Sequence, residues 1–327
     1  MLGKKQGDIL IIKTDGLAAF VAAEPVFEAI RNAHPGAAIS LLTSASLQRI
    51  ARAAPYFDQV AAMPSFKIPD ERKAFVKQLK SRKFERVYDL AGDDNGKKLF
   101  AAMGPFRPKW HAATLARKKR SGKKALLTEQ PEIGPVLAEA GIDAPSRLPD
   151  FRWALEARKD SANMQPSWYG ITPPFGLLLP GRHEAHRWSA QGYAGVAATM
   201  AANGYMPVLA GDKDLHAFGD EIAHETPQLV DLTGKTDHLQ LAALALESAF
   251  FVSDHADEMH LVVSVGCQGV IVANAKSPDV KPDGRHVVTL MADGDLSSAA
   301  PDFVWRTLAN MGLTDGGAEA RRAAAAR

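Results

Sequence analysis

Side chains capable of chemistry first occur at residues 13–20, where the sequence reads KTDGLAAF. Asp15 is the only carboxylate in this stretch, and it precedes Gly16 where an apolar run gives way to a helical pattern. A glycine-bearing turn of this kind usually presents groups to a cleft, and a carboxylate there can accept a proton. Asp15 is therefore a candidate general base. Alternatively, it is a turn residue whose carboxylate caps nearby backbone amides.

A second candidate turn reads PGRHEAHRW at residues 180–188. It follows an apolar run and precedes a helical pattern, so its backbone amides and basic side chains would lie where a diphosphate can bind. The candidates are Gly181, Arg182, His186 and Arg187. Because histidine is mostly neutral at pH 7, Arg187 is the stronger candidate cation. In the alternative interpretation, His186 and Arg187 are solvated loop residues.

A third candidate turn reads DLTGKTDHL at residues 231–239. It contributes three candidate binding residues, Thr233, Gly234 and Lys235. Thr236 or Asp237 is placed to cap the helix that follows. A ligand-binding turn and a capped turn without a ligand both fit this pattern.

The elements that must position these turns alternate between strand and helix patterns. Short apolar runs at 9–13, 38–43 and 85–90 predict buried parallel strands, and helical spacing at 20–34, 46–55, 71–82 and 132–142 predicts helices between and after them. The same alternation returns after residue 174, with strands predicted at 175–180, 206–211, 249–254 and 269–274 and helices at 189–204, 238–248 and 300–312. This repetition predicts an α/β protein with doubly wound parallel sheets.

The pattern also predicts the domain boundaries. Residues 143–174 lose periodicity and mix proline, charge and scattered aromatic residues, as is typical of a linker. We therefore expect an N-terminal domain at 1–150, a linker at 151–174, a C-terminal domain at 175–313, and a disordered tail at 314–327.

Composition excludes several classes of protein. The chain has 327 residues and a formal net charge of +2, which does not by itself indicate a nucleic-acid partner. Its single cysteine, Cys267, excludes an internal disulfide framework. The N-terminus lacks the apolar core of a signal peptide, and no stretch approaches the roughly 20 apolar residues that cross a bilayer. We expect a cytoplasmic protein, and no metal-ligand spacing occurs in the sequence.

One segment is strongly basic. Residues 107–124 carry eight Lys or Arg and no acidic residue, with Trp110 and His111 between them. A basic loop of this kind suits an anionic ligand or an anionic membrane surface, and the alternative is a solvated charged loop. No nucleic-acid-binding module is recognisable.

Taken together, the motifs resemble a known family. The stretches ILIIKTDGLAAFVAAEPVFEAIRNAHPGAAISLLT, APYFDQV, VYDLAG, LLLPG, HRWSAQGYAGVAATMAANGYMPVLAGD, DLTGKTDHLQLAALALESAFFVSD and MHLVVSVG occur in the order, and near the spacing, of the ADP-heptose:lipopolysaccharide heptosyltransferases, glycosyltransferase family 9. The resemblance runs from about Asp8 to Val288. It implies a GT-B fold, in which two Rossmann-like domains face each other across a cleft.

The resemblance also implies where the substrates bind. The N-terminal domain would hold the acceptor, with Lys13, Arg107, Lys109 and Arg120 as candidate contacts. The C-terminal domain would hold a nucleotide-sugar donor such as ADP-heptose. The reaction implied is an inverting, metal-independent transfer to a lipopolysaccharide-core or other glycan acceptor, without a cofactor. The basic segment 107–124 would also allow peripheral contact with the inner membrane.

The first turn departs from the family pattern. The family's Gly-Asp pair, whose aspartate resembles the general base, aligns here with Ala18 and Ala19. A methyl group cannot accept a proton, so Asp15 would have to supply the carboxylate.

The sugar-donor signature departs further. The family's Asp-Thr-Gly-Pro-Met-His is represented by residues 255–260, HADEMH, of which Met259 and His260 match. Asp254 could replace the lost aspartate beside His255, whereas His260 fits a packed or capping histidine as well as a ligand contact. The new carboxylates at Asp257 and Glu258 suit a helix N-terminus but would repel an anionic donor. The sequence therefore favours an active transferase, and a catalytically inactive relative that binds a glycan, a nucleotide or a protein remains the alternative.

Overall fold

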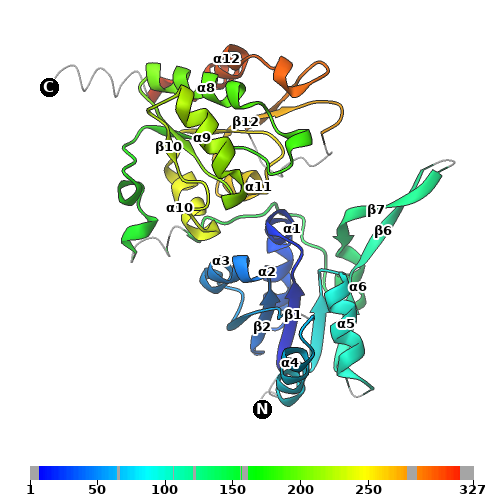
Figure 1. The fold of residues 1–327 in the computed structure, drawn as a ribbon. Coiled ribbons are helices and arrows are strands. Elements are labelled where there is room, and N and C mark those ends of the chain that lie inside the picture. The colour runs from blue at the N-terminus through cyan, green and yellow to red at the C-terminus, as the bar shows by residue number, and fades with distance from the viewer. Residues whose placement is uncertain are drawn as a thin grey trace. The chain divides into compact units, whose positions relative to one another are not determined.

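The structure is a computed structural model that describes residues 7–64, 67–105, 107–120, 123–154, 156, 161–277 and 286–316, with backbone only at 114–120 and 123–131. The chain forms two compact units, Met1–Pro149 and Asp150–Arg327, called here the N-terminal and C-terminal units (Figure 1). Each unit is an α/β layer structure with its own parallel sheet, as predicted.

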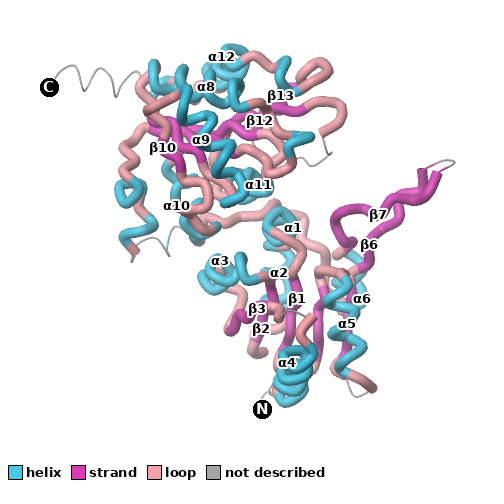
Figure 2. The backbone as a smooth tube through the Cα atoms, in the orientation of Figure 1, coloured by secondary structure: helices cyan, strands magenta, loops and turns pink. Residues whose placement is uncertain are grey.

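The N-terminal unit is built on a five-stranded parallel sheet in the order β3-β2-β1-β4-β5. Its strands are β1 (Ile9–Lys13), β2 (Ile39–Thr43), β3 (Gln59–Ala62), β4 (Arg86–Asp89) and β5 (Lys109–Ala112). Every residue of β1 and β2 is buried, as expected for central parallel strands covered on both faces. Figure 2 shows these strands between the helices of the unit.

The helices of this unit fall mostly where the sequence predicts them. They are α1 (Leu17–Ala22), α2 (Glu24–Ala33), α3 (Gln48–Ala53), α4 (Pro69–Ser81), α5 (Asp94–Met103) and α6 (Gly134–Glu139), with a 3-10 turn η1 (Ala45–Leu47). The single helix predicted at 20–34 is two helices, because Pro25 stands in the first turn of α2, where its missing N–H is not needed.

The basic segment 107–124 is not a loop throughout, which corrects the expectation from its charge. It contains β5 and most of an antiparallel hairpin of β6 (Thr114–Arg120) and β7 (Lys123–Glu132). Residues 117–120 are all cationic, so the period-two alternation that reveals a strand is absent from the sequence.

The C-terminal unit contains a six-stranded parallel sheet in the order β10-β9-β8-β11-β12-β13. Its strands are β8 (Phe175–Leu179), β9 (Met206–Leu209), β10 (Val230–Asp231), β11 (Phe250–Ser253), β12 (Gly269–Ala273) and β13 (Val287–Met291). Its helices are α8 (Ala190–Ala202), α9 (His216–Glu225), α10 (His238–Glu247), α11 (Asp257–Ser264) and α12 (Pro301–Asn310), with 3-10 turns η2 (Ala162–Met164), η3 (Pro166–Tyr169), η4 (Glu184–His186), η5 (Lys213–Leu215) and η6 (Leu296–Ser298).

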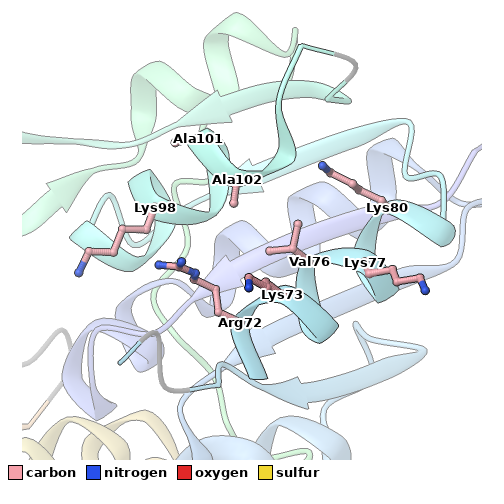
Figure 3. A pocket seen from close by; sticks show the side chains of 8 residues that line it. All are labelled: Arg72, Lys73, Val76, Lys77, Lys80, Lys98, Ala101 and Ala102. Atoms are coloured by element: carbon pink, nitrogen blue, oxygen red, sulfur yellow. The ribbon is translucent and has the colours of Figure 1, made fainter. Parts of the chain in front are cut away.

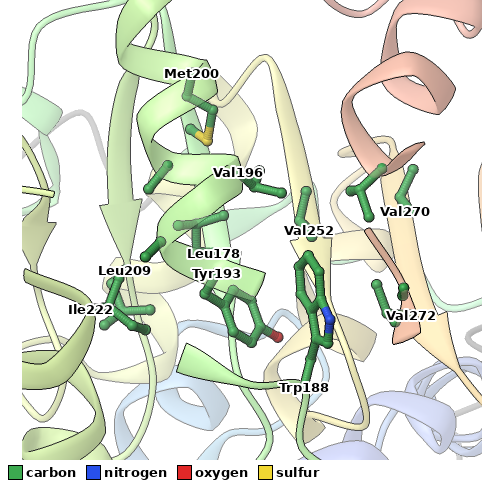
Figure 4. Packing of buried hydrophobic residues seen from close by; sticks show 14 of the residues in the cluster. Leu178, Trp188, Tyr193, Val196, Met200, Leu209, Ile222, Val252, Val270 and Val272 are labelled. Atoms are coloured by element: carbon green, nitrogen blue, oxygen red, sulfur yellow. The ribbon is translucent and has the colours of Figure 1, made fainter. Parts of the chain in front are cut away.

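The core of this unit lies between its sheet and α8. Figure 4 shows Tyr193 and Met200 of α8 packing with Val252 and Val270 of the sheet, and all four are fully buried. Trp188 belongs to the same cluster and is 1% exposed, so the loop that follows β8 is tied to the core at its far end. A tightly packed core of this kind fixes the position of the loops that leave it.

Candidate active site

Each sheet has one point where the strand order reverses direction. In the N-terminal unit this switch point lies between β1 and β4, and in the C-terminal unit it lies between β8 and β11. Ligands of open α/β sheets bind outside the carboxyl ends of the strands at such points. The turns that the sequence singled out after residues 13, 179 and 253 all leave these strands, so the fold brings the candidates to the two expected places.

A lysine–aspartate pair occupies the N-terminal switch point. Lys13 Nζ donates hydrogen bonds to Asp15 Oδ2 at 2.9 Å and to the Leu90 carbonyl at 3.2 Å. The Lys13 side chain is 1% exposed and that of Asp15 is 17% exposed. Desolvation raises the pKa of Asp15 and lowers that of Lys13, while their mutual attraction opposes both shifts.

The other oxygen of Asp15 has unused hydrogen-bonding capacity. Asp15 Oδ1 is buried and accepts no hydrogen bond from another residue in the described part of the chain. A carboxylate fixed through one oxygen, with the other oxygen unused and the pKa raised, has the properties of a positioned general base.

Two further carboxylates lie at this edge, and sequence inspection did not single them out. Asp93 caps α5 by accepting from the Gly96 amide at 2.7 Å, and it accepts from Thr14 Oγ1 at 2.8 Å. Asp89 ends β4, is 2% exposed, and burial raises its pKa to about 6. Both carboxylates attract the buried Lys13 ammonium. The VYDLAG motif contains Asp89, but only the strand order reveals that it lies beside Lys13.

Ala18 and Ala19 do not lie in the turn. The helix α1 begins at Leu17, directly after Gly16, whose φ of 99° is the left-handed conformation that glycine favours. Ala19 is 9% exposed, so it faces the interior of the unit. Asp15 is consequently the residue that immediately precedes the glycine and the helix.

Asp254 fastens the two loops of the C-terminal switch point together. Its Oδ1 accepts from the Gly181 amide at 2.6 Å, and its Oδ2 accepts from the Trp188 amide at 2.8 Å and the Tyr193 hydroxyl at 3.0 Å. Desolvation at this fully buried position raises the pKa of Asp254 to about 7 against the effect of these bonds. Both oxygens are used within the protein, so Asp254 positions the loop after β8.

Gly181 is required where the two loops meet. A Cβ at this position would lie 2.5 Å from the His255 carbonyl and 2.7 Å from Asp254 Oδ1, closer than real Cβ atoms approach. The backbone of this loop can therefore approach β11 only with glycine there.

The cations of the loop after β8 differ in their partners. Arg182 is 46% exposed and lies between two carboxylates, at 3.6 Å from Asp212 and 3.7 Å from Asp257. Arg187 is half-buried, and its guanidinium stacks 4.1 Å above the Phe218 ring of α9. Arg187 forms no ion pair within the described residues, so its charge is the less compensated of the two.

The histidines face each other across the same switch point. The rings of His186 and His255 are edge to face with centroids 6.4 Å apart. His186 Nδ1 is buried and makes no hydrogen bond to a described residue. One ring comes from each of the two loops that the sequence linked to the sugar donor.

The first turn of α11 carries the acidic pair Asp257 and Glu258. Desolvation of the half-buried Glu258 raises its pKa to about 7, and the neighbouring Asp257 charge acts in the same direction. Met259 is 1% exposed and packs in the core, whereas His260 is half-buried. The acidic pair therefore places negative charge beside Arg182 at this edge.

The turn after β10 is organised by internal contacts. Thr233 is fully buried, its amide donates to Asp231 Oδ1 at 2.8 Å, and its hydroxyl lies 3.0 Å from His216 Nδ1. Lys235 Nζ donates to the Asp231 carbonyl at 2.6 Å, and Gly234 has φ 65°. Asp237 caps α10 in a capping box with Gln240, which selects Asp237 over Thr236 as the helix cap. These contacts agree with the capped-turn interpretation.

The candidate acceptor contacts lie apart along the chain. Arg107 is exposed and stacks 4.0 Å above the Phe100 ring, and Lys109 is exposed at the start of β5. The Arg120 side chain lies outside the described residues. The structure thus pairs Lys13 with Asp15, whereas Arg107 contacts Phe100.

Comparison with known proteins identifies the family of this chain. The model of glycosyltransferase family 9 (heptosyltransferase) matches residues 72–278, more than half of the chain. The chain belongs to glycosyltransferase family 9. No curated protein matches the family 9 chain at the level of sequence.

Solved structures show that the fold is that of the GT-B heptosyltransferases. ADP-heptose lps heptosyltransferase II of E. coli is 16% identical, with a TM-score of 0.75 over 94% of this chain and 99% of that one. A glycosyl transferase family 9 protein of Veillonella parvula is 18% identical, with a TM-score of 0.75 over 95% and 99%. E. coli heptosyltransferase WaaC with ADP is 15% identical, with a TM-score of 0.71 over 93% and 99%. Because these sequence identities are low, the similarity establishes only the fold of this family 9 member.

The described part of this family 9 chain contains neither a candidate metal site nor a candidate membrane span. No group of three or more His, Cys, Asp and Glu side chains there is arranged to hold a metal ion. No helix there is long and apolar enough to span a bilayer.

Proposed function

We propose that this chain is an active glycosyltransferase that moves a sugar from a nucleoside-diphosphate sugar to a hydroxyl of an anionic glycan. ADP-heptose is the first donor to test, because the similar WaaC structures contain ADP and ADP-2-deoxy-2-fluoro heptose. A lipopolysaccharide core is the first acceptor to test, because the similar heptosyltransferase II acts on lipopolysaccharide by name.

The observation that carries this proposal is the Lys13–Asp15 pair. Lys13 holds Asp15 Oδ2 at 2.9 Å and favours the ionised carboxylate, whereas desolvation raises the pKa of Asp15 and makes it a stronger base. The buried Oδ1 accepts no hydrogen bond from another described residue, so its acceptor capacity is unused, and an acceptor hydroxyl would have to displace the atoms that cover it. A family 9 chain that had lost all chemistry would have no requirement for this pair at the switch point.

The chemistry proposed is a direct displacement. The acceptor oxygen forms a bond to the anomeric carbon while the bond from that carbon to the diphosphate oxygen breaks, which inverts the configuration. The acceptor proton passes to Asp15 Oδ1, and the bonding electrons leave with the diphosphate. Arg182 and Arg187 of the C-terminal unit would stabilise the charge that develops on the leaving group. No step of this route calls for a metal ion.

A second candidate function is binding without transfer, and one observation favours it. Asp257 and Glu258 occupy the first turn of α11, where an anionic donor would otherwise gain from the helix N-terminus. If both are ionised, they oppose a diphosphate. Glu258 reduces this conflict in part, because a pKa of about 7 leaves it partly protonated at neutral pH.

We also propose a cytoplasmic location with peripheral contact at the inner membrane. The lone Cys267 is unpaired and buried, which agrees with a reducing compartment. The exposed Arg107 and Lys109 offer charge to an anionic acceptor.

The test is a turnover screen of the full chain. The purified protein is incubated with ADP-, UDP- and GDP-sugars, with and without a deacylated lipopolysaccharide core, and the released nucleoside diphosphate is measured. We expect release that requires the acceptor and is confined to one nucleotide class. Calorimetric binding of a nucleoside diphosphate without release from any of its sugars would support the binding protein instead.

A further inference from the structure

A basic groove lies between α4 and α5 on the N-terminal unit (Figure 3). It has a volume of about 610 Å³. Its cations are Arg72, Lys73, Lys77 and Lys80 on α4 and Lys98 on α5. All five side chains are exposed, so their charges are available to a ligand in solution.

The cations are little compensated within the described residues. Lys73 lies 3.8 Å from Asp70, but these side chains are 75% and 96% exposed, and such a pair contributes little. The nearest other acidic side chains along the two helices are Glu71 and Asp94, and Asp94 lies 3.5 Å from Lys97, which does not line the groove. The groove therefore has a net positive charge.

The floor of the groove is apolar. It is formed by Val76, Ala101 and Ala102. Among the described residues, the lining contains no aromatic side chain on which a base could stack, and no carboxylate, amide or hydroxyl side chain that could accept a hydrogen bond from a sugar. These absences disfavour a nucleotide or a glycan, because both are recognised through such groups.

We propose that this groove binds the headgroups of anionic phospholipids and holds the N-terminal unit on a membrane surface. Lysine and arginine supply charge to the phosphates, and the alkyl floor accommodates the glycerol carbons next to them. One face of α4 carries four of the cations, at positions 72, 73, 77 and 80. The helix can therefore lie along the membrane surface. This inference rests on the peripheral membrane contact proposed above and names the surface that makes it; the transferase reaction is tested separately by turnover.

The test is binding of the full chain to vesicles of phosphatidylcholine with about one quarter phosphatidylglycerol, measured by cosedimentation. We compare two triple variants. The groove variant is Lys77→Gln, Lys80→Gln and Lys98→Gln, and the control is Arg49→Gln, Arg52→Gln and Lys97→Gln. Each lowers the formal net charge from +2 by three, to −1, at exposed positions of the same unit. Circular dichroism confirms that both remain folded.

We expect the groove variant to lose affinity by at least about 10-fold, since each cation near an anionic surface contributes substantially, and the control to change by less than about 3-fold. Binding of the wild type should also weaken steeply as salt rises. Equal losses in the two variants, or wild-type binding by the groove variant, would overturn the proposal. So would groove-dependent binding of soluble glycerol phosphate or of a 20-nucleotide RNA by a protein that ignores the vesicles.

Discussion

Asp254 Oδ1 accepts a hydrogen bond from the Gly181 amide at 2.6 Å, and this bond joins the loops after β8 and β11 at the C-terminal switch point. The same carboxylate accepts from the Trp188 amide and the Tyr193 hydroxyl. One buried side chain thus sets the path of the segment that carries Arg182 and Arg187. The sugar-donor side of the site depends on it without Asp254 having to contact a ligand.

Asp254→Asn should destabilise the C-terminal unit. The amide can accept at one atom only, so at least one buried N–H or O–H donor loses its partner, at a cost of about 1–3 kcal/mol for each. Urea unfolding at pH 4, where Asp254 contributes most to stability, measures the loss, with Asp257→Asn as the control at a 41% exposed position. Equal stability of the two variants would show that the Asp254 bonds contribute nothing.

The pH dependence of stability should also change in Asp254→Asn. The pKa of Asp254 rises from 3.8 to about 7 on folding, so the folded protein binds the proton more tightly than the unfolded chain does. The contribution of Asp254 to the free energy of unfolding is therefore greatest near pH 4 and falls as pH rises toward 7. Between pH 4 and pH 7, the free energy of unfolding should decrease less in the variant than in the wild type. A variant whose curve runs parallel to that of the wild type would refute this assignment.

Gly181→Ala should damage the same junction through sterics alone. The new Cβ would meet the His255 carbonyl at 2.5 Å, so the loop must shift, at a cost of about 1–3 kcal/mol. Gly134→Ala is the matched control, because nothing lies within 4 Å of a Cβ there. Thermal unfolding and nucleoside-diphosphate affinity should both fall in Gly181→Ala and remain unchanged in the control. Tolerance of alanine at both positions would contradict the close approach.

Charge at the C-terminal switch point should control affinity for a nucleoside diphosphate. Arg187→Gln should weaken binding about 10-fold, since it removes the cation that no described carboxylate pairs with. Asp257→Asn should strengthen binding, because it removes a negative charge 3.7 Å from Arg182. Calorimetry with ADP measures both changes. Affinity that responds to neither substitution would place the nucleotide elsewhere.

The sequence predicted both sheets because buried parallel strands such as 9–13 and 175–179 are continuous apolar runs. It did not predict the strands β3, β5, β10 and β13, the hairpin of β6 and β7, or the helices α5 and α9, because short length, charge or polarity masks the period in these segments. Among site residues, Asp15 and the basic residues after β8 stood out because they follow strands, whereas Lys13 was implied by the family resemblance. The roles of Asp89 and Asp254 could not be seen, since each depends on a neighbouring strand far away in the sequence.

The proposal that Asp15 is the general base of an active transferase is tested most directly by the turnover of Asp15→Asn with one confirmed sugar donor. Asp94→Asn is the control, because Asp94 is 83% exposed and is on α5 near the same sheet edge. We expect Asp15→Asn to lower kcat by roughly 100-fold or more, the usual scale for loss of a general base, with little change in donor affinity, and Asp94→Asn to retain wild-type turnover. Full activity in Asp15→Asn would contradict the assignment of Asp15 as the general base.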